Sequence, residues 1–151
     1  MLRLSKKTDY AIILLAHLGE VEIPSSAQEM ATYYKLPYPM VANILKQLVS
    51  SGLIKSIQGK HGGYILAMPT DKINLAEIIL VTDSPFNLVE CAHDEEICKV
   101  HQCCPTRRPL LALHHKIQQF VEETTLAVII RDAEPINLTV EGSSHETTHL
   151  S

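Results

Sequence analysis

Four cysteines occur in this chain of 151 residues, and all of them lie between positions 91 and 104. They are Cys91, Cys98 and the adjacent pair Cys103 and Cys104. Clustered thiols in a chain without a recognisable export signal favour metal binding over disulfide bonding. The gaps match neither the paired cysteines of zinc ribbons nor the repeated spacing of ferredoxins. The spacing therefore predicts a metal centre and leaves the metal open.

The neighbours of these cysteines suggest how a centre would be completed. Adjacent residues direct their side chains apart in most backbones, so we expect only one of Cys103 and Cys104 to be a ligand. Cys104 precedes a predicted long helix, whose positive N-terminal end favours a thiolate. Three thiolates suit an iron–sulfur cluster with one further ligand, or zinc completed by His93 or His101. Four reduced cysteines without metal are the third possibility, which their charged surroundings disfavour.

The elements that must position these cysteines begin with a helix predicted over residues 106–131. Six residues, most of them apolar, step by three and four as at a helix–helix seam: Leu110, Leu113, Ile117, Phe120, Thr124 and Ala127. Such a face needs a partner, and a second copy of the chain is the simplest one. Residues 87–106 show little periodicity and predict an ordered loop, and the polar residues 133–151 predict a disordered tail.

The first half of the chain predicts three short helices and a hairpin. Helical spacing covers residues 8–18, with Gly19 just past the end. Ser26 and Glu29 fit a capping box for a second helix, and Pro39 suits the first turn of a third, which Gly52 closes. Strands at 53–57 and 64–67 flank a glycine-rich turn, and a helix capped by Asn74 follows. The predicted fold class is therefore mainly α with a small β-hairpin wing (α+β), in the arrangement of a winged helix-turn-helix.

A winged helix predicts which residues contact DNA. The third helix directs Tyr38, Met40, Asn43 and Lys46 outward, and the amide of Asn43 suits an adenine edge. The other predicted contacts are to phosphate or to the minor groove: Lys35, Lys46, Arg3, Lys6 and Lys7 to phosphate, and Gln58, Lys60 and His61 at the wing tip.

Charge and composition indicate which other classes of protein this chain could belong to. The net charge is −4, but residues 1–68 hold seven Lys/Arg against four acids, a balance of +3 that permits contact with phosphate. No apolar run approaches the ~20 residues of a membrane span. No secretory cleavage site is apparent, so we expect a cytoplasmic protein. No catalytic triad, phosphate-binding loop or carboxylate pair is evident, so we expect no enzyme.

Over about residues 1–132 the chain resembles a known family, the winged-helix regulators that include the Isc and Suf cluster-assembly regulators and the nitric-oxide sensor NsrR. The resemblance rests on residues 2–11 (LRLSKKTDYA), on residues 48–54 (LVSSGLI) and 59–66 (GKHGGYIL) around the wing, and on the cysteine loop. The SUF-system regulator is the most similar branch. The resemblance implies a homodimer whose long helices cross, and a cluster in each loop near the partner's DNA-binding domain.

The resemblance also implies a ligand set. Cys91, Cys98 and Cys104 match the three ligand cysteines of the family, with Cys103 as a substitute because the first gap is one residue longer than in several members. Isc-type members carry a histidine where this chain has Arg107, which places a [2Fe-2S] site in doubt. NsrR-like members use an aspartate from the other subunit, and Asp9 stands at that position. This favours a [4Fe-4S] cluster, although Asp9 also suits a helix N-terminus.

The predicted organisation is a DNA-binding domain at 1–83, a cluster-binding loop at 84–105, a dimerisation helix at 106–132 and a disordered tail at 133–151. The recognition helix differs from several members at Pro39, Ala42 and Asn43, so we expect an operator unlike the Isc type. The predicted function is a bacterial repressor of iron–sulfur assembly genes whose cluster status changes operator affinity. The alternatives are a zinc- or thiol-based regulator without a cluster and a nitric-oxide-responsive repressor.

Overall fold

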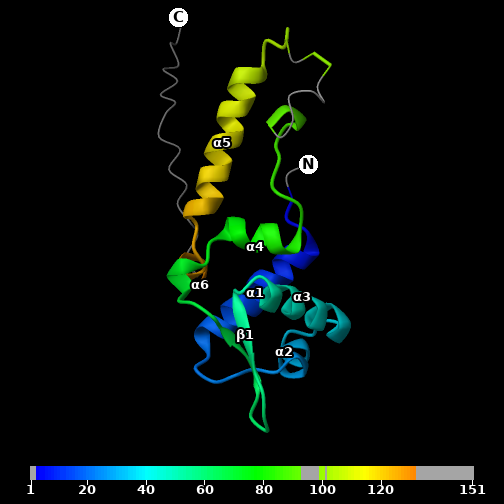
Figure 1. Ribbon diagram of the computed structural model, residues 1–151, viewed down its shortest axis with the longest axis vertical. Coiled ribbons are helices and arrows are strands. Elements are labelled where there is room, and N and C mark those ends of the chain that lie inside the picture. Colours follow the sequence, from blue (N-terminus) through cyan, green and yellow to red (C-terminus); the bar gives the residue numbers. More distant parts are fainter. Residues whose placement is uncertain (1–2, 93–98, 101, 132–151) are drawn as a thin grey trace, which may run out of the picture.

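The computed structural model describes residues 3–92, 99–100 and 102–131. Figure 1 shows a helical domain with a hairpin projecting from one side. One long helix extends from the opposite side of the domain, along the longest axis of the molecule. The elements are α1 (Lys6–Glu20), α2 (Ala27–Tyr33), α3 (Tyr38–Ser50), β1 (Ile54–Ile57), β2 (Gly63–Leu66), η1 (Thr70–Lys72), α4 (Leu75–Thr82), η2 (Glu90–Ala92), α5 (Arg107–Glu123) and α6 (Leu126–Arg131). This arrangement confirms the predicted winged helix. Below, residues 3–82 with α6 are called the winged-helix domain, and residues 83–123 the α5 arm.

Helices α2 and α4 both begin with a capping box, as the sequence predicts. The Ser26 hydroxyl accepts the Glu29 backbone N–H at 3.1 Å, and the Glu29 carboxylate accepts the Ser26 N–H at 2.7 Å. Asn74 and Glu77 repeat the pattern at 2.9 and 3.2 Å. Each box satisfies two backbone donors, and a cap of this kind stabilises a helix start by about 1 kcal/mol. The Ser26 backbone N–H, and then the Ser26 side chain, hold the pKa of the Glu29 carboxyl below its ordinary value by hydrogen bonding to the carboxylate.

One hydrophobic core joins α1, α2, α3, β1, α4 and α6. Its largest fully buried apolar side chains are Leu14, Leu15, Met30, Val41, Ile44, Leu45, Leu48, Ile54, Ile73, Ile78 and Leu126. Burial of each large aliphatic side chain contributes about 1.5–3 kcal/mol relative to exposure. Helix α5 takes little part, because His114 is its one buried residue.

Gly19 lies inside α1, and the prediction that it follows the helix is wrong. The helix runs one residue further, and Val21 in extended backbone ends it. A Cβ at position 19 would lie 2.7 Å from Cδ1 of Ile130 and 2.9 Å from Cγ2 of Thr70. The glycine therefore provides space for α6 and the η1 turn to pack closely against α1.

The predicted single helix over residues 106–131 is two helices, and that prediction is wrong. Thr124 leaves helical backbone with ψ 107°, and its hydroxyl donates to the Phe120 carbonyl at 2.7 Å. Beyond it, the Leu75 N–H donates to the Thr124 carbonyl at 2.8 Å, and the Leu126 N–H donates to the Ile73 carbonyl at 2.7 Å. The break turns α6 back onto the winged-helix domain, where Leu126 is fully buried. The end of the predicted seam thus packs within its own chain, because Thr124 is buried and bonded to Leu75.

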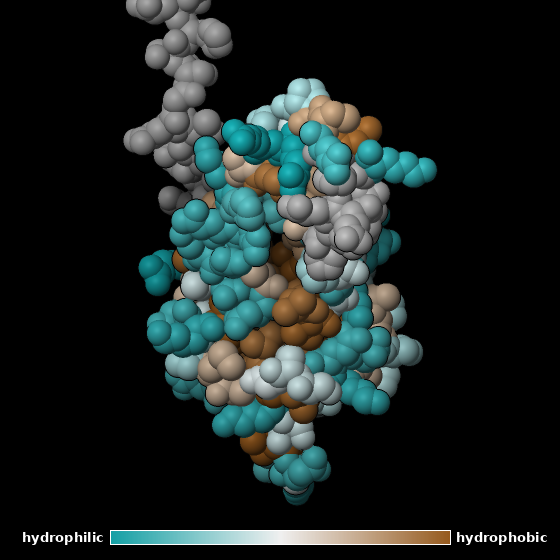
Figure 2. Space-filling model, turned by 45° about the horizontal axis from the view of Figure 1, so that its top comes forward, coloured by the Kyte–Doolittle hydropathy of each residue, from teal (hydrophilic) through white to brown (hydrophobic). Residues whose placement is uncertain are grey.

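An apolar surface remains open on the α5 arm and beside it. On α5, Leu113 is 46% exposed and Phe120 is 43% exposed. A cavity of about 590 Å³ lies between α1, α4 and α5, with Leu4, Ile79 and Ile117 among its lining residues. Figure 2 shows hydrophobic side chains gathered in and below a hollow on one face of the molecule. Exposed apolar surface of this kind marks sites that a partner covers.

Within the described ranges, none of the helices is both long and apolar enough to cross a bilayer. The tail predicted to be disordered, residues 133–151, lies outside the described residues. So do three of the predicted candidate ligands, Cys98, His93 and His101.

Candidate DNA-binding surface and cysteine segment

Helices α2 and α3 are joined by a tight turn at residues 34–37. Lys35 adopts left-handed backbone with φ 54°, and the Leu36 N–H donates to the Ala31 carbonyl at 2.9 Å. Pro39 occupies the first turn of α3, where its fixed φ suits a helix start. The turn sets the angle between the two helices, which is the geometry of a helix-turn-helix. The Lys35 side chain is exposed beside it.

Helix α3 has one buried and one open face. Val41, Ile44, Leu45 and Leu48 are completely buried. The predicted base-reading side chains lie on the other side: Tyr38 is 49% exposed, Met40 is 37% exposed, and Asn43 and Lys46 are also exposed. A shallow hollow lined by Asn43, Lys46 and Val81 runs along this helix. The open face has the amide, the cation and the apolar groups that base edges and phosphates can meet.

The hairpin forms a wing at the end of the domain remote from α5 (Figure 1). Its strands pair antiparallel, with Ile54 opposite Leu66 and Ile57 opposite Gly63. Gln58, Lys60 and His61 are exposed at its tip, as the minor-groove prediction requires.

The basic residues at the chain start lie elsewhere. The buried Thr8 hydroxyl is 2.8 Å from that of Thr82, which places the first turn of α1 against the end of α4. Arg3 and Lys6 are exposed there and Lys7 is half-buried. The structure therefore groups Tyr38, Met40, Asn43 and Lys46 on α3, but places Lys6 and Lys7 at the α4 side of the domain.

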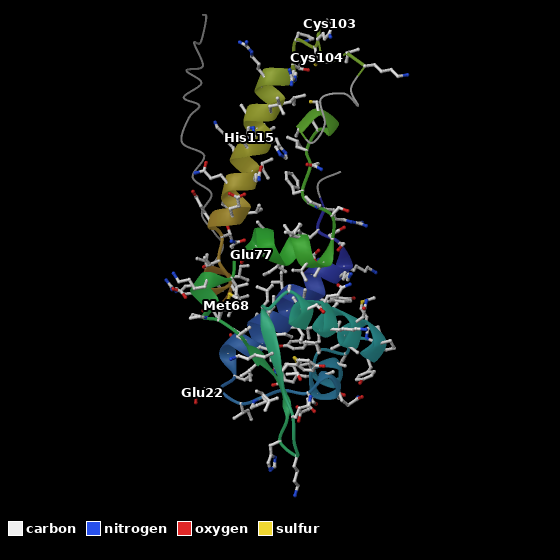
Figure 3. All side chains as sticks on the ribbon, in the orientation of Figure 1. Glu22, Met68, Glu77, Cys103, Cys104 and His115 are labelled. Atoms are coloured by element: carbon white, nitrogen blue, oxygen red, sulfur yellow. The ribbon has the colours of Figure 1, made fainter. Side chains whose placement is uncertain are left out.

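The described cysteines lie on segments at the end of the molecule opposite the wing. Figure 3 shows Cys103 and Cys104 at the N-terminal end of α5. The η2 turn, which carries Cys91, packs against the same helix. Cys91 and Cys104 are half-buried, Cys103 is exposed, and none of the three forms a disulfide. Cys91 and Cys104, the two predicted cysteine ligands within the described residues, thus lie in segments next to α5.

The two adjacent cysteines differ in their surroundings. The Cys104 sulfur lies 3.4 Å from the Thr106 hydroxyl, whereas the Cys103 thiol donates to the Val100 carbonyl at 3.6 Å. Hydrogen bonds from the Thr106 side chain and backbone, and more weakly the charge and N–H of Arg107, lower the pKa of the Cys104 thiol. A lowered pKa favours the thiolate, which is the metal-binding and nucleophilic form.

Asp9 is exposed in the first turn of α1, and its backbone N–H donates to the Ser5 carbonyl at 3.0 Å. That position agrees with a carboxylate at a helix N-terminus and leaves it accessible to a second chain. Among the described residues, no three His, Cys, Asp or Glu side chains are grouped closely enough to hold a metal ion. The set that the sequence predicts is incomplete without Cys98.

Two contacts that the sequence analysis missed connect the α5 arm to the domain. The buried His114 accepts the Leu88 backbone N–H through Nδ1 at 3.3 Å and stacks on Phe86 at 5.8 Å. Thr82, at the start of the same connecting segment, bonds to Thr8 as described above. A histidine at helical spacing from Leu110 and Ile117 was the available signal for the first contact. The threonine pair has none, since its members are 74 positions apart.

Comparison with known proteins identifies the family to which this chain belongs. A family profile described as "Rrf2: Iron-dependent Transcriptional regulator" matches residues 4–132. The chain belongs to the Rrf2 family. Among curated members of similar sequence, the transcriptional regulator NsrR of Halalkalibacterium halodurans is 27% identical over 89% of this chain and 94% of its own length. The transcriptional regulator CymR of Bacillus subtilis is 29% identical over 83% of this chain and 87% of its own length.

Solved structures of Rrf2 regulators share the fold. CymR, the global cysteine regulator of B. subtilis, has a TM-score of 0.73 at 26% identity, covering 89% of this chain and all of its own. The T. potens IscR has a TM-score of 0.66 at 27% identity, covering 88% and 89%. The relatives are transcriptional regulators rather than enzymes, and regulators of this family bind DNA. This Rrf2 protein is therefore a DNA-binding transcriptional regulator, with relatives named NsrR, CymR and IscR.

Proposed function

We propose that this Rrf2 regulator holds an iron–sulfur cluster through Cys91, Cys98 and Cys104 and represses genes of iron–sulfur cluster assembly, of the SUF type. The observation that carries the proposal is the placement of Cys91 and Cys104. Both are half-buried free thiols on segments in contact with α5, away from the core of the winged-helix domain. The target genes follow from the resemblance of residues 2–11 and of the cysteine spacing to SUF-system regulators.

The donor set fits such a group. The Thr106 hydroxyl beside Cys104 favours its thiolate, and thiolates are the ligands that iron–sulfur clusters require. When bound, the cluster supplies iron–thiolate bonds that respond to oxidants, nitric oxide and iron supply. A [4Fe-4S] cluster is favoured over [2Fe-2S], with Asp9 of a second chain as the fourth ligand and Cys103 as a substitute for Cys104.

The residues of the chain itself connect the cysteines to DNA. Leu88 lies three positions before Cys91 and is held by His114, while Thr82 holds Thr8 next to Asp9. A conformational change near Cys91 would therefore affect both the end of α4 and the first turn of α1. Cluster binding can change DNA affinity only if the cluster binds one conformational state of the protein more tightly than the other. In our proposal, the two states differ along this connection.

The remaining parts of the proposal concern partners. A second copy of the chain covers the exposed Leu113 and Phe120 of α5 and forms a homodimer. The operator is double-stranded DNA: Asn43 reads a base edge, Tyr38 and Met40 contact bases, and Lys35 and Lys46 contact phosphates. Gln58, Lys60 and His61 enter an adjacent minor groove, and Lys6 and Lys7 contribute positive charge from the α4 side of the domain.

Metal analysis of protein purified without oxygen tests the cluster. We expect iron and sulfide with little zinc, and absorbance near ~400 nm. Cys91→Ala, Cys98→Ala and Cys104→Ala each lose the iron, while Cys103→Ala, the matched neighbour, retains it. Iron that persists in Cys104→Ala and disappears in Cys103→Ala moves the ligand to Cys103. Colourless, zinc-loaded or metal-free protein that binds DNA contradicts the proposal.

A second candidate function is regulation by the thiols alone, without a cluster. The activated Cys104 beside the exposed Cys103 favours it, as does the similarity to CymR. DNA binding that changes with thiol oxidation in metal-free protein supports this candidate. The similarity to NsrR supports a third, a cluster-bearing repressor that responds to nitric oxide.

A further inference from the structure

His17 of α1 contacts the residues that flank α2 on both sides, Ser25 and Tyr34, and none of the roles above uses it. Its Nδ1 lies 3.0 Å from the Tyr34 hydroxyl, and its Nε2 lies 3.1 Å from the Ser25 hydroxyl. Tyr34 is the C-cap of α2, and Ser25 precedes α2 and is only 7% exposed. One half-buried imidazole thus connects both ends of the same helix.

Ser25 extends this connection to the wing. The Ser25 N–H donates to the Tyr64 carbonyl at 3.2 Å, and the Tyr64 N–H donates to the Ser25 carbonyl at 2.8 Å. A Cβ on the adjacent Gly63 would lie 2.6–2.9 Å from the backbone of Ser25. The glycine therefore allows Ser25 to pair with β2 as a third, very short strand at the base of the wing.

Tyr34 extends the connection to the recognition helix. Its N–H donates to the Met30 carbonyl at 3.0 Å, and the next residue is the left-handed Lys35 of the turn into α3. The rings of His17 and Tyr33 meet the Tyr34 ring edge-on at 5.5 and 4.8 Å. Burial raises the pKa of the Tyr34 phenol, which keeps its hydroxyl protonated. A hydroxyl donates or accepts as its partner requires, so both bonds to His17 form with either tautomer of the ring.

We propose that His17 is a positioning residue for DNA recognition, which holds the wing at a fixed distance and angle from α3. The proposal rests on the DNA-binding function of the chain. Helix and wing contact different parts of one operator, so their combined affinity depends on how well their separation is fixed before binding. Loss of the two His17 hydrogen bonds leaves every direct DNA contact in place but makes simultaneous contact by α3 and the wing less favourable.

Matched variants separate the two bonds. His17→Asn places an amide near the Nδ1 position and keeps a partner for Tyr34, whereas His17→Gln reaches the Nε2 position and keeps one for Ser25. His17→Leu removes both, while Tyr34→Phe and Ser25→Ala each remove one hydroxyl. Gln28→Ala is the control, because within the described residues this exposed α2 side chain bonds to Thr32 alone, at 3.2 Å.

The probe is a duplex that the wild-type protein selects from a random library, and the readouts are affinity and a hydroxyl-radical footprint. We expect His17→Leu to weaken binding about tenfold, and each single-bond variant about threefold. The footprint loses protection at the nucleotides that the wing contacts and keeps protection at those that α3 contacts. The double variant His17→Leu/Ser25→Ala binds no worse than His17→Leu, because the two share one connection.

Thermal unfolding of the same samples distinguishes positioning from stability. A merely structural His17 gives a lower Tm with unchanged affinity and footprint per folded molecule, and that result overturns the proposal. If His17→Leu does not fold, Tyr34→Phe retains the ring packing and tests the proposal through its own expected threefold loss and the same change in footprint. Failure of the wild-type protein to select any duplex is a different outcome, since it contradicts DNA binding itself.

Discussion

The winged-helix domain and the α5 arm differ in how completely each region buries its own apolar side chains. In the domain, four consecutive inward positions of α3 are fully buried, and α6 returns to close the core with Leu126. In the arm, α5 buries only His114 and exposes Leu113 and Phe120. The domain is therefore a unit that one chain completes. In our proposal, a second chain and a cluster complete the arm.

The largest expected effect concerns stability on the two sides of this comparison. Ile44→Ala removes a completely buried side chain and should lower the free energy of unfolding by about 2–5 kcal/mol. Leu113→Ala, on the exposed face of α5, should lower that of the isolated chain by less than about 1 kcal/mol. Urea unfolding at low protein concentration measures both. Equal losses would show that the arm shares the core of the domain.

The next prediction concerns self-association. Phe120→Asp places a charge on the open α5 face and should weaken the dimer at least about tenfold. Glu123→Asp on the same helix, which preserves the charge, is the matched control. Sedimentation equilibrium gives the dissociation constants. A dimer that tolerates the charge at position 120 does not use this face.

On the domain side, DNA affinity should separate base reading from phosphate contact. Asn43→Ala should lose about 1–3 kcal/mol of discrimination at one base pair. Lys46→Ala should weaken all sequences alike and lower the salt slope by about 1. Binding titrations at several salt concentrations distinguish them. Uniform weakening by Asn43→Ala would assign Asn43 to the backbone.

The smallest effect tests the arm through its thiol. Since the pKa of Cys104 is lowered, its thiolate forms at lower pH than that of an ordinary cysteine, and alkylation follows the thiolate. The midpoint of the iodoacetamide rate against pH should therefore lie below the ordinary value in reduced, metal-free protein. Thr106→Val removes the first cause and should move the midpoint upward. Mass spectrometry of the Cys104 peptide records the rate, and an unmoved midpoint excludes Thr106 as the cause.

The sequence predicted what local patterns determine. The helical period, the Ser26 and Asn74 caps and the glycines of the turn specify the winged helix, because each acts over a few residues. It failed at Gly19 and Thr124, whose conformations depend on α6 and on the backbone of residues 73–75. Those partners lie some fifty or more positions away, and no local pattern encodes them.

The candidate sites divide in the same way. The outward residues of α3 follow from helix periodicity, and the structure places them on the open face. The cysteine types and spacing predicted metal chemistry, but spacing does not determine which sulfur atoms converge. The contacts that fix the arm, Thr8 with Thr82 and Leu88 with His114, pair residues distant in the chain.

In our proposal, the cysteine end of the α5 arm controls the affinity of the winged-helix domain for DNA. The most direct measurement is oxygen-free fluorescence anisotropy with one selected duplex and two preparations of the same protein, iron-loaded and chelator-stripped. The account predicts dissociation constants that differ at least about fivefold, as for a typical coupling between two sites. Indistinguishable constants for the loaded and stripped dimers would contradict it.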